Sequence, residues 1–253
     1  MRQAQRFPIA GNHGDSTMND TLNRALIAAA WRNDVAEAAR LIEQGADVNA
    51  RDKTVQSAYL IATSEGFLSL LALTLQHGAD VAGKDSYNGT GLIRAADRGH
   101  ALVIGRLLQA GIDVDHINNL GWTALHEAII LGDGEERYVD CVRLLLAGGA
   151  DPTLPLQRDG TSPLEHAESR GFGTIAKTIR TVIQSYPPTD ATEALFAAVR
   201  DGDADGAVIA LRFGANPASP NQDGMAPIAI AQEAGDQDLV RLLKALNHDR
   251  QVI

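Results

Sequence analysis

The stretch that decides the fold is Thr123-Ala124-Leu125-His126-Glu127-Ala128, which is followed by Gly-Ala-Asp at residues 149–151. A large apolar residue stands three positions before its last alanine, and a glycine stands four positions after it. The same pattern recurs, with asparagine replacing the glycine once, around seven alanines: Ala29, Ala62, Ala95, Ala128, Ala167, Ala198 and Ala231. Most of the steps between these alanines are 33 residues, which indicates a protein built from seven aligned repeats.

Each repeat predicts two helices joined by a turn. The Leu-x-x-Ala spacing places both side chains on one helical face, where alanine lets a neighbouring helix approach closely. The glycine that follows can adopt the left-handed conformation that ends a helix. A second apolar-periodic segment, such as 103–108, then runs to the glycine of the next Gly-Ala-Asp or its variant. One repeat cannot bury its apolar face alone, so stability must come from stacking.

These features together resemble the ankyrin repeat. The 33-residue period, residues 123–128, Ser162-Pro163-Leu164, and Gly99-His100 followed by Leu107-Leu108-x-x-Gly111 carry the resemblance, which extends from residue 21 to about 248. It implies an all-α repeat solenoid, a helix–turn–helix–hairpin stack of about seven units with short β-hairpin loops. It also implies that His126 makes a hydrogen bond that fixes the junction between hairpin and helix.

The repeat register predicts four segments. Residues 1–20 form a flexible N-terminal segment, 21–185 hold repeats one to five, 186–191 are a proline-containing linker, and 192–253 hold repeats six and seven with a C-terminal cap. Repeat four carries about five extra residues around 132–138, and repeat five lacks the Gly-Ala-Asp due at Ile183. Whether repeats six and seven continue the stack is therefore left open by the sequence.

The charge balance narrows the class of partner. Lys and Arg number 22 against 32 Asp and Glu, a net charge of −10, which disfavours binding to nucleic acid or to an anionic membrane. The excess acid, including Glu135, Glu136 and Asp140, is expected on outer helices and loops. One cysteine, Cys141, excludes an intrachain disulfide and is expected to be a buried small hydrophobe. We expect a cytoplasmic monomer without membrane association.

Two motifs resemble ligand-binding sites but lack features that those sites require. Residues 201–206 copy the first half of a calcium-binding EF-hand loop, but position twelve is Arg212 instead of glutamate, so a solvated turn with Asp203 as a helix cap is expected. Residues 171–176 resemble half of a dinucleotide fingerprint but follow a helix rather than a strand. The histidines fall in different repeats. The sequence therefore predicts no catalytic residues, no metal and no cofactor.

Because no catalytic or metal site is predicted, binding of a partner is the function that remains. The resemblance implies a concave groove lined by hairpin tips and inner helices. Aromatic, aliphatic and arginine residues gather in this groove at the junction of repeats three and four, as in protein-binding hot spots. The candidate partner-binding residues are Tyr87, Arg98, Leu120, Trp122, Ile130 and Leu131. For Trp122, Ile130 and Leu131, packing against the neighbouring hairpins is an equal alternative.

The sequence therefore favours a non-enzymatic adaptor or scaffold that binds a protein partner through this groove. Glu37 and Arg143, placed on outer helices, are expected to lie away from it. The alternative is an acidic inhibitor or immunity-type protein that occludes a basic enzyme, with Glu135 and Glu136 attracting the target. Only the net charge favours this alternative.

Overall fold

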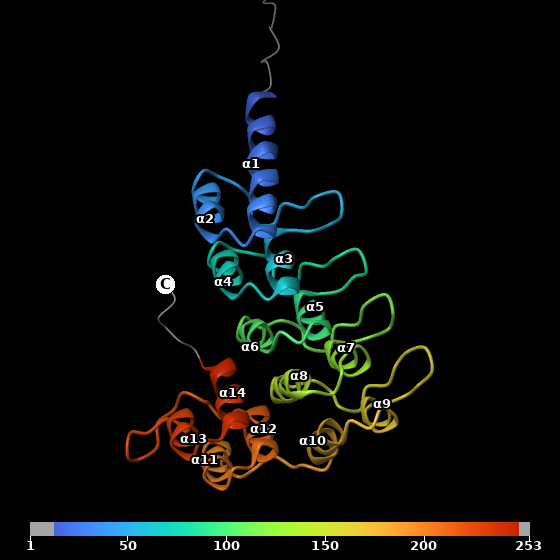
Figure 1. Ribbon diagram of the computed structural model, residues 1–253, viewed down its shortest axis with the longest axis vertical. Helices are drawn as coiled ribbons and strands as arrows, with labels where there is room; N and C mark the ends of the chain where they lie inside the picture. The colour runs from blue at the N-terminus through green and yellow to red at the C-terminus, as the bar shows by residue number, and fades with distance from the viewer. Residues whose placement is uncertain (1–12, 248–253) are drawn as a thin grey trace, which may run out of the picture.

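The computed structural model describes residues 13–247, which form fourteen helices and no strand. The helices pair as the repeats predict, an inner helix followed by an outer one, so the expected all-α repeat solenoid is confirmed (Figure 1). The first five pairs are α1 (His13–Trp31) and α2 (Val35–Glu43), α3 (Ala58–Glu65) and α4 (Leu68–Gln76), α5 (Gly91–Asp97) and α6 (Ala101–Gln109), α7 (Ala124–Ile130) and α8 (Glu136–Ala147), and α9 (Pro163–Ser169) and α10 (Gly173–Ile183). The last two are α11 (Ala191–Asp201) and α12 (Ala204–Arg212), and α13 (Pro227–Ala234) and α14 (Gln237–Leu246).

Local chemistry sets the ends of these helices. Serine or threonine caps each of the inner helices from α3 to α9, as when the Thr90 side chain accepts a hydrogen bond from the Ile93 amide. Asp203 caps α12 by accepting from the Gly206 amide, as the sequence predicted. At the end of α3, Gly66 takes the left-handed conformation, with φ of 76°, which only glycine adopts readily. The glycine that ends α3 and the aspartate that caps α12 are therefore those that the repeat pattern predicted.

The N-terminal boundary differs from the expected one. Helix α1 begins at His13, inside the segment 1–20 that the repeat register leaves outside the stack. Residues 1–12 lie outside the described residues. The loops between repeats are hairpin turns closed by backbone bonds, such as Asn118 N to Trp122 O at 3.0 Å. In the described residues, one pair, Lys84 with Thr90, forms a β-bridge.

Repeats one to five stack through their inner helices. In Figure 1, α1, α3, α5, α7 and α9 form one column, and each packs against the next. The alanine column lies at the centre of this interface, where Ala62, Ala95 and Ala128 are completely buried. Leu92 and Leu125, three positions before two of these alanines, are also fully buried. Small and large side chains thus alternate along a continuous apolar core.

Repeats six and seven do not extend this column. The chain turns back after α10, so that α12 packs against α8 and α10 while α14 packs against α6 and α8. In Figure 1 the last hairpin loop consequently points away from the side on which the earlier loops project. Gly105 on α6 permits this arrangement, because a Cβ atom there would lie 2.1 Å from the carbonyl oxygen of Ala245 on α14. The sequence left open whether repeats six and seven continue the stack, and the structure shows that they pack against its outer helices instead.

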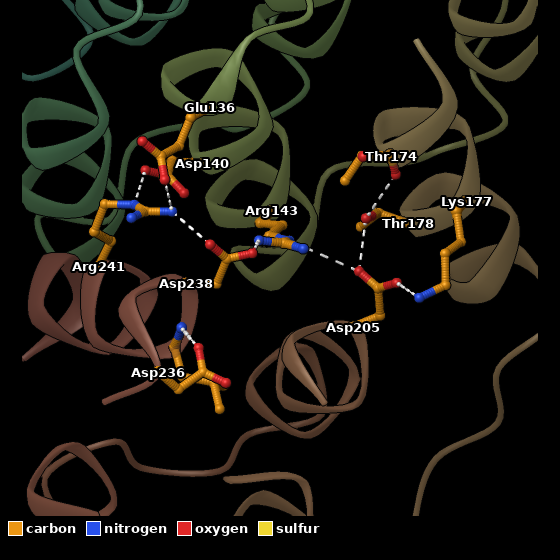
Figure 2. A network of polar contacts seen from close by, with 11 residues as sticks. Glu136, Asp140, Arg143, Thr174, Lys177, Thr178, Asp205, Asp236, Asp238 and Arg241 are labelled. Atoms are coloured by element: carbon orange, nitrogen blue, oxygen red, sulfur yellow. Dashed lines mark hydrogen bonds and ion pairs between the residues drawn. The ribbon is translucent and has the colours of Figure 1, made fainter. Parts of the chain in front are cut away.

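Charged side chains occupy the surface between the turned-back repeats and the stack, which we call the turn-back interface (Figure 2). Arg143 of α8 is buried, and its Nη1 donates to Asp238 Oδ2 of α14 at 2.7 Å. Asp205 of α12 is also buried and lies 3.1 Å from Lys177 Nζ of α10. Arg241 of α14 donates from Nε to Asp140 Oδ2 at 2.7 Å. Each contact joins helices from different parts of the chain.

Several of these residues depart from the sequence-based expectation. Asp140 is buried rather than exposed, and burial raises the pKa of its carboxyl group although Arg241 opposes that shift. Glu136 lies on the surface but pairs with Arg241 at 2.6 Å. Arg143, placed on an outer helix, is covered by the turned-back repeats. Asp205 belongs to the stretch expected to be a solvated turn. Asp140, Arg143 and Asp205 are buried because the turned-back repeats form a second layer on the outer helices of the stack, whereas Glu136 remains on the surface as expected.

Candidate functional site

The hairpins of repeats three and four are rigid platforms built by two polar side chains. Asp85 Oδ1 accepts from the amides of Tyr87 and Gly89, each at 2.8 Å. Asn118 Oδ1 accepts from the amides of Leu120 at 2.9 Å and Trp122 at 3.1 Å. Side chains that bond to the backbone two and four residues onward hold a turn in one conformation. The aromatic and aliphatic tips are thereby presented at defined positions.

Adjacent hairpins are also bonded to each other. The Asn119 amide donates to the Tyr87 carbonyl at 2.9 Å, and the Asn88 side chain donates to the Ile117 carbonyl at 3.2 Å. His116 Nε2 lies 2.7 Å from the Asn88 carbonyl oxygen. The two tips therefore form one surface, and a ligand that touches both would cost little ordering of the loops.

Between these hairpins and the inner helices lies a hollow of about 310 Å³, which we call the groove hollow. Its apolar walls are Tyr87, Leu120 and Trp122 from the hairpins, with Ile93 and Leu131 from α5 and from the end of α7. Its polar lining is Asp85, Arg94, Asp97, Asn118 and Glu127. The side chains of Tyr87, Leu120 and Leu131 are 60%, 51% and 50% exposed, so a ligand could cover substantial apolar surface.

A second hollow of about 390 Å³ adjoins the first and shares Leu120 and Trp122 with it. Ile130, Leu156, Arg158, Asp159 and His166 complete its lining. The structure thus gathers five of the six candidate residues along two adjoining hollows. Arg98 lines neither of them. It ends α5, and its guanidinium pairs with Glu65 of the preceding repeat at 2.7 Å.

Several lining residues were not assigned to this surface from the sequence, and the most buried charged residue among them is Glu127. Its side chain is 5% exposed and accepts one hydrogen bond, from Asn118 Nδ2 to Oε1 at 2.8 Å. Burial, with a contribution from Asp97, raises the pKa of Glu127 to about 7. The signal in the sequence was a glutamate within an otherwise apolar helix, but the pattern could not show which groups would face it.

The neighbouring His126 has a structural role. Its side chain is buried, and Nδ1 accepts from the Thr123 amide at 3.2 Å and lies 2.9 Å from Thr123 Oγ1. These contacts form the hydrogen bond at the hairpin–helix junction that the resemblance implied. Burial lowers the pKa of His126 to about 4, so the imidazole is neutral at physiological pH.

Other elements of the sequence analysis can be located as well. Cys141 is fully buried as expected, and burial raises the pKa of its thiol. Between residues 13 and 247, His, Cys, Asp and Glu side chains form no group of three or more that could hold a metal ion. No helix in that range is both long and apolar enough to cross a membrane.

Comparison with known proteins agrees with this architecture. The family model for ankyrin repeats in three copies matches residues 59–156 and 92–185, and the single ankyrin-repeat model matches residues 22–53. The ankyrin repeat protein YahD of Escherichia coli (strain K12) is 36% identical over 140 residues, which are 55% of this chain and 69% of YahD.

A solved structure is also similar to this chain. An ankyrin repeat domain from Acinetobacter baumannii AYE is 48% identical, with a TM-score of 0.60, and the match covers 62% of this chain and 80% of that domain. Ankyrin repeats are generally protein-interaction modules without catalytic activity. The family models together span more than half of the sequence. The chain therefore belongs to the ankyrin-repeat family.

Proposed function

We propose that this protein is a non-enzymatic adaptor that binds one protein partner through the two adjoining hollows at repeats three to five. The observation that carries the proposal is the exposure of Tyr87 and Leu120 on hairpins held in one conformation, beside half-buried Trp122 and exposed Leu131 at the end of α7. Rigid aromatic and aliphatic anchors surrounded by polar residues are typical of interaction hot spots. The buried free cysteine suits action as a monomer in the reducing cytoplasm.

The acidic-inhibitor alternative has only the net charge of −10 in its favour. Of the two glutamates that it needs for steering, Glu136 already forms an ion pair with Arg241 of the same chain. A carboxylate whose charge is already compensated contributes less to long-range attraction of a basic target. We therefore retain the adaptor as the proposed function.

The test uses the full chain as bait with single substitutions at the hairpin tips. Tyr87→Ala and Leu120→Ala remove exposed side chains, so folding should be preserved while a partner's affinity falls by about 2 kcal/mol. Leu102→Ala, on outer helix α6 and 44% exposed, is the matched control. Partners captured from a cell extract would be quantified by mass spectrometry. If both tip variants retain every partner of the wild type, the proposal is wrong.

A further inference from the structure

Glu127 is a buried acidic residue that forms no ion pair with another described residue. Its side chain lines the groove hollow, is 5% exposed, and receives its one hydrogen bond from a neutral amide, Asn118. Within residues 13–247, no donor reaches its Oε2 atom, and no arginine, lysine or histidine forms an ion pair with it. Burying a carboxylate without a compensating charge is unfavourable. The free protein therefore holds a buried acidic group whose one hydrogen bond comes from a neutral amide and whose nearby cation, Arg94, does not pair with it directly.

The other charges of the groove hollow leave an excess of negative charge. Arg94 is the one cationic residue of the lining, and it already forms an ion pair with Asp85 at 3.5 Å. Asp97, on the same helix as Arg94, also lines the hollow, and none of the ion pairs between described residues includes its carboxylate. Asp97 and Glu127 therefore remain as two acceptors for a positively charged group that enters from the solvent.

The walls favour a planar cation over a hydrated one. Tyr87, which is 60% exposed, and Trp122 both line the hollow, and aromatic faces attract cations. Leu120 and Leu131 lower the local polarity, which strengthens an ion pair formed against them. A guanidinium is more weakly hydrated than an ammonium, stacks on aromatic rings, and offers five donors in a fixed plane. These properties match a hollow that is lined by both carboxylates and aromatic rings.

We propose that the groove hollow binds an arginine side chain of the protein partner, with Glu127 and Asp97 accepting hydrogen bonds from its guanidinium and with Tyr87 and Trp122 against its faces. This assignment rests on the proposed function and specifies its ligand. The second hollow, whose lining includes Leu156 and Ile130, adjoins the arginine site and is available to a neighbouring apolar side chain of the same partner.

The charge state of Glu127 makes the binding dependent on pH. The groups that face Glu127 are Asp97 and Arg94 from α5 and Asp85 and Asn118 from the two hairpins, and its pKa in the free protein is about 7. A guanidinium binds the ionised carboxylate. Protein molecules in which Glu127 is protonated must therefore release that proton when they bind the arginine. The affinity is expected to rise about tenfold between pH 6 and pH 8, as the ionised fraction increases.

The experiment selects random twelve-residue peptides, displayed on phage, against the full chain at pH 8. We expect arginine in the selected peptides. Replacing that arginine by citrulline, a neutral isostere, should weaken binding at least about tenfold, and so should Glu127→Gln in the protein. Glu65→Gln is the matched control, because Glu65 pairs with Arg98 outside both hollows. The fold of each variant is checked by circular dichroism.

The outcomes separate the arginine site from the groove itself. The arginine site would be overturned if the selected peptides carried no cation. It would also be overturned if citrulline or lysine peptides bound as tightly as arginine ones, or if binding to Glu127→Gln were unchanged. The groove function survives those results if Tyr87→Ala and Leu120→Ala still abolish binding. A library that yields no binder also overturns the arginine site. Peptides that bind both tip variants as tightly as the wild type would remove the support for the groove function.

Discussion

The stack of repeats one to five and the turn-back interface join the same kind of helix pair in different ways. In the stack, inner helices meet through fully buried alanines and leucines such as Ala95 and Leu92. At the turn-back interface, outer helices also approach closely, with Gly105 against Ala245, and they add the ion pairs of Arg143, Asp205 and Arg241 (Figure 2). An alanine column accepts any neighbour with the same column, whereas an ion network requires particular partners. The first interface propagates a repeat and the second ends it.

Buried carboxylates show the same contrast at the level of single groups. Asp205 at the turn-back interface has Lys177 and Arg143 as ionic partners, and Asp140 has Arg241. Glu127 in the groove has a neutral amide. A charge that is compensated within the molecule contributes to its architecture. A buried acidic group that lines a hollow and forms no ion pair is available to a ligand, and this difference motivates the substitutions that follow.

The largest effect is expected from Arg143→Ala, which tests whether the turn-back interface depends on one buried cation. The substitution leaves Asp205 and Asp238 without this partner, and breaking a buried ion pair costs roughly 3 kcal/mol. Hydrogen exchange followed by mass spectrometry should show faster exchange in α12 and α14 than in α3 and α5. Equal loss of protection in all four helices would mean that the two regions unfold as one unit.

A smaller effect, about 2 kcal/mol, is expected from Gly105→Ala, which tests the close approach of α14 to α6. Alanine usually stabilises a helix relative to glycine, but here its Cβ would meet the Ala245 carbonyl oxygen and force the helices apart. Gly173→Ala is the control, because a Cβ at that position has no neighbour within 4 Å. Denaturant unfolding of both variants should give changes of stability that differ in sign or clearly in size.

Glu127→Gln should stabilise the protein at high pH, by roughly 1–2 kcal/mol at pH 8. The pKa of Glu127 is raised from 4.5 to about 7, so the folded state retains a proton that the unfolded state loses. The stability that protonated Glu127 contributes to the wild type is fully present below pH 4.5 and is lost as the pH rises through 7. Glutamine can keep the bond from Asn118 without the charge.

Unfolding of both proteins across pH 4.5 to 8 checks this expectation, since their difference isolates Glu127 from the shared titration of His126. A Gln variant that is less stable than the wild type at pH 8 would show that the carboxylate contributes to folding. Greater stability combined with weaker peptide binding would instead identify Glu127 as a residue kept for its ligand.

The smallest effect is expected from Arg40→Ala, which breaks an ion pair outside both interfaces. Arg40 and Glu37 lie three residues apart on the exposed side of α2, with 2.6 Å between Nη2 and Oε1. Exposed pairs of this kind contribute little because water solvates both groups in either state. The Tm should stay unchanged within error. A clear fall in Tm would show that charge pairs matter in this protein even without burial.

Most of the fold could be predicted, and the candidate site only in part. Five of the six predicted residues line the adjoining hollows, because hairpin tips and helix ends follow directly from the repeat register. Arg98 was expected beside them but pairs with Glu65, since a long side chain can reach a neighbouring repeat. Glu127 and Asn118, which meet at 2.8 Å, were not predicted, because their contact depends on how a hairpin folds over its helix.

By itself the sequence determined the repeat unit, the pairing of helices and the positions of their ends. These depend on spacings of three or four residues and on glycine, serine and threonine at turns, which act locally. The tertiary structure alone decided that repeats six and seven turn back onto the outer helices. Ala198 and Ala231 continue the alanine column as in a regular stack. The turned-back repeats make contacts such as Arg143 with Asp238, 95 residues apart, and a pattern with a spacing of three or four residues cannot specify contacts between residues so far apart.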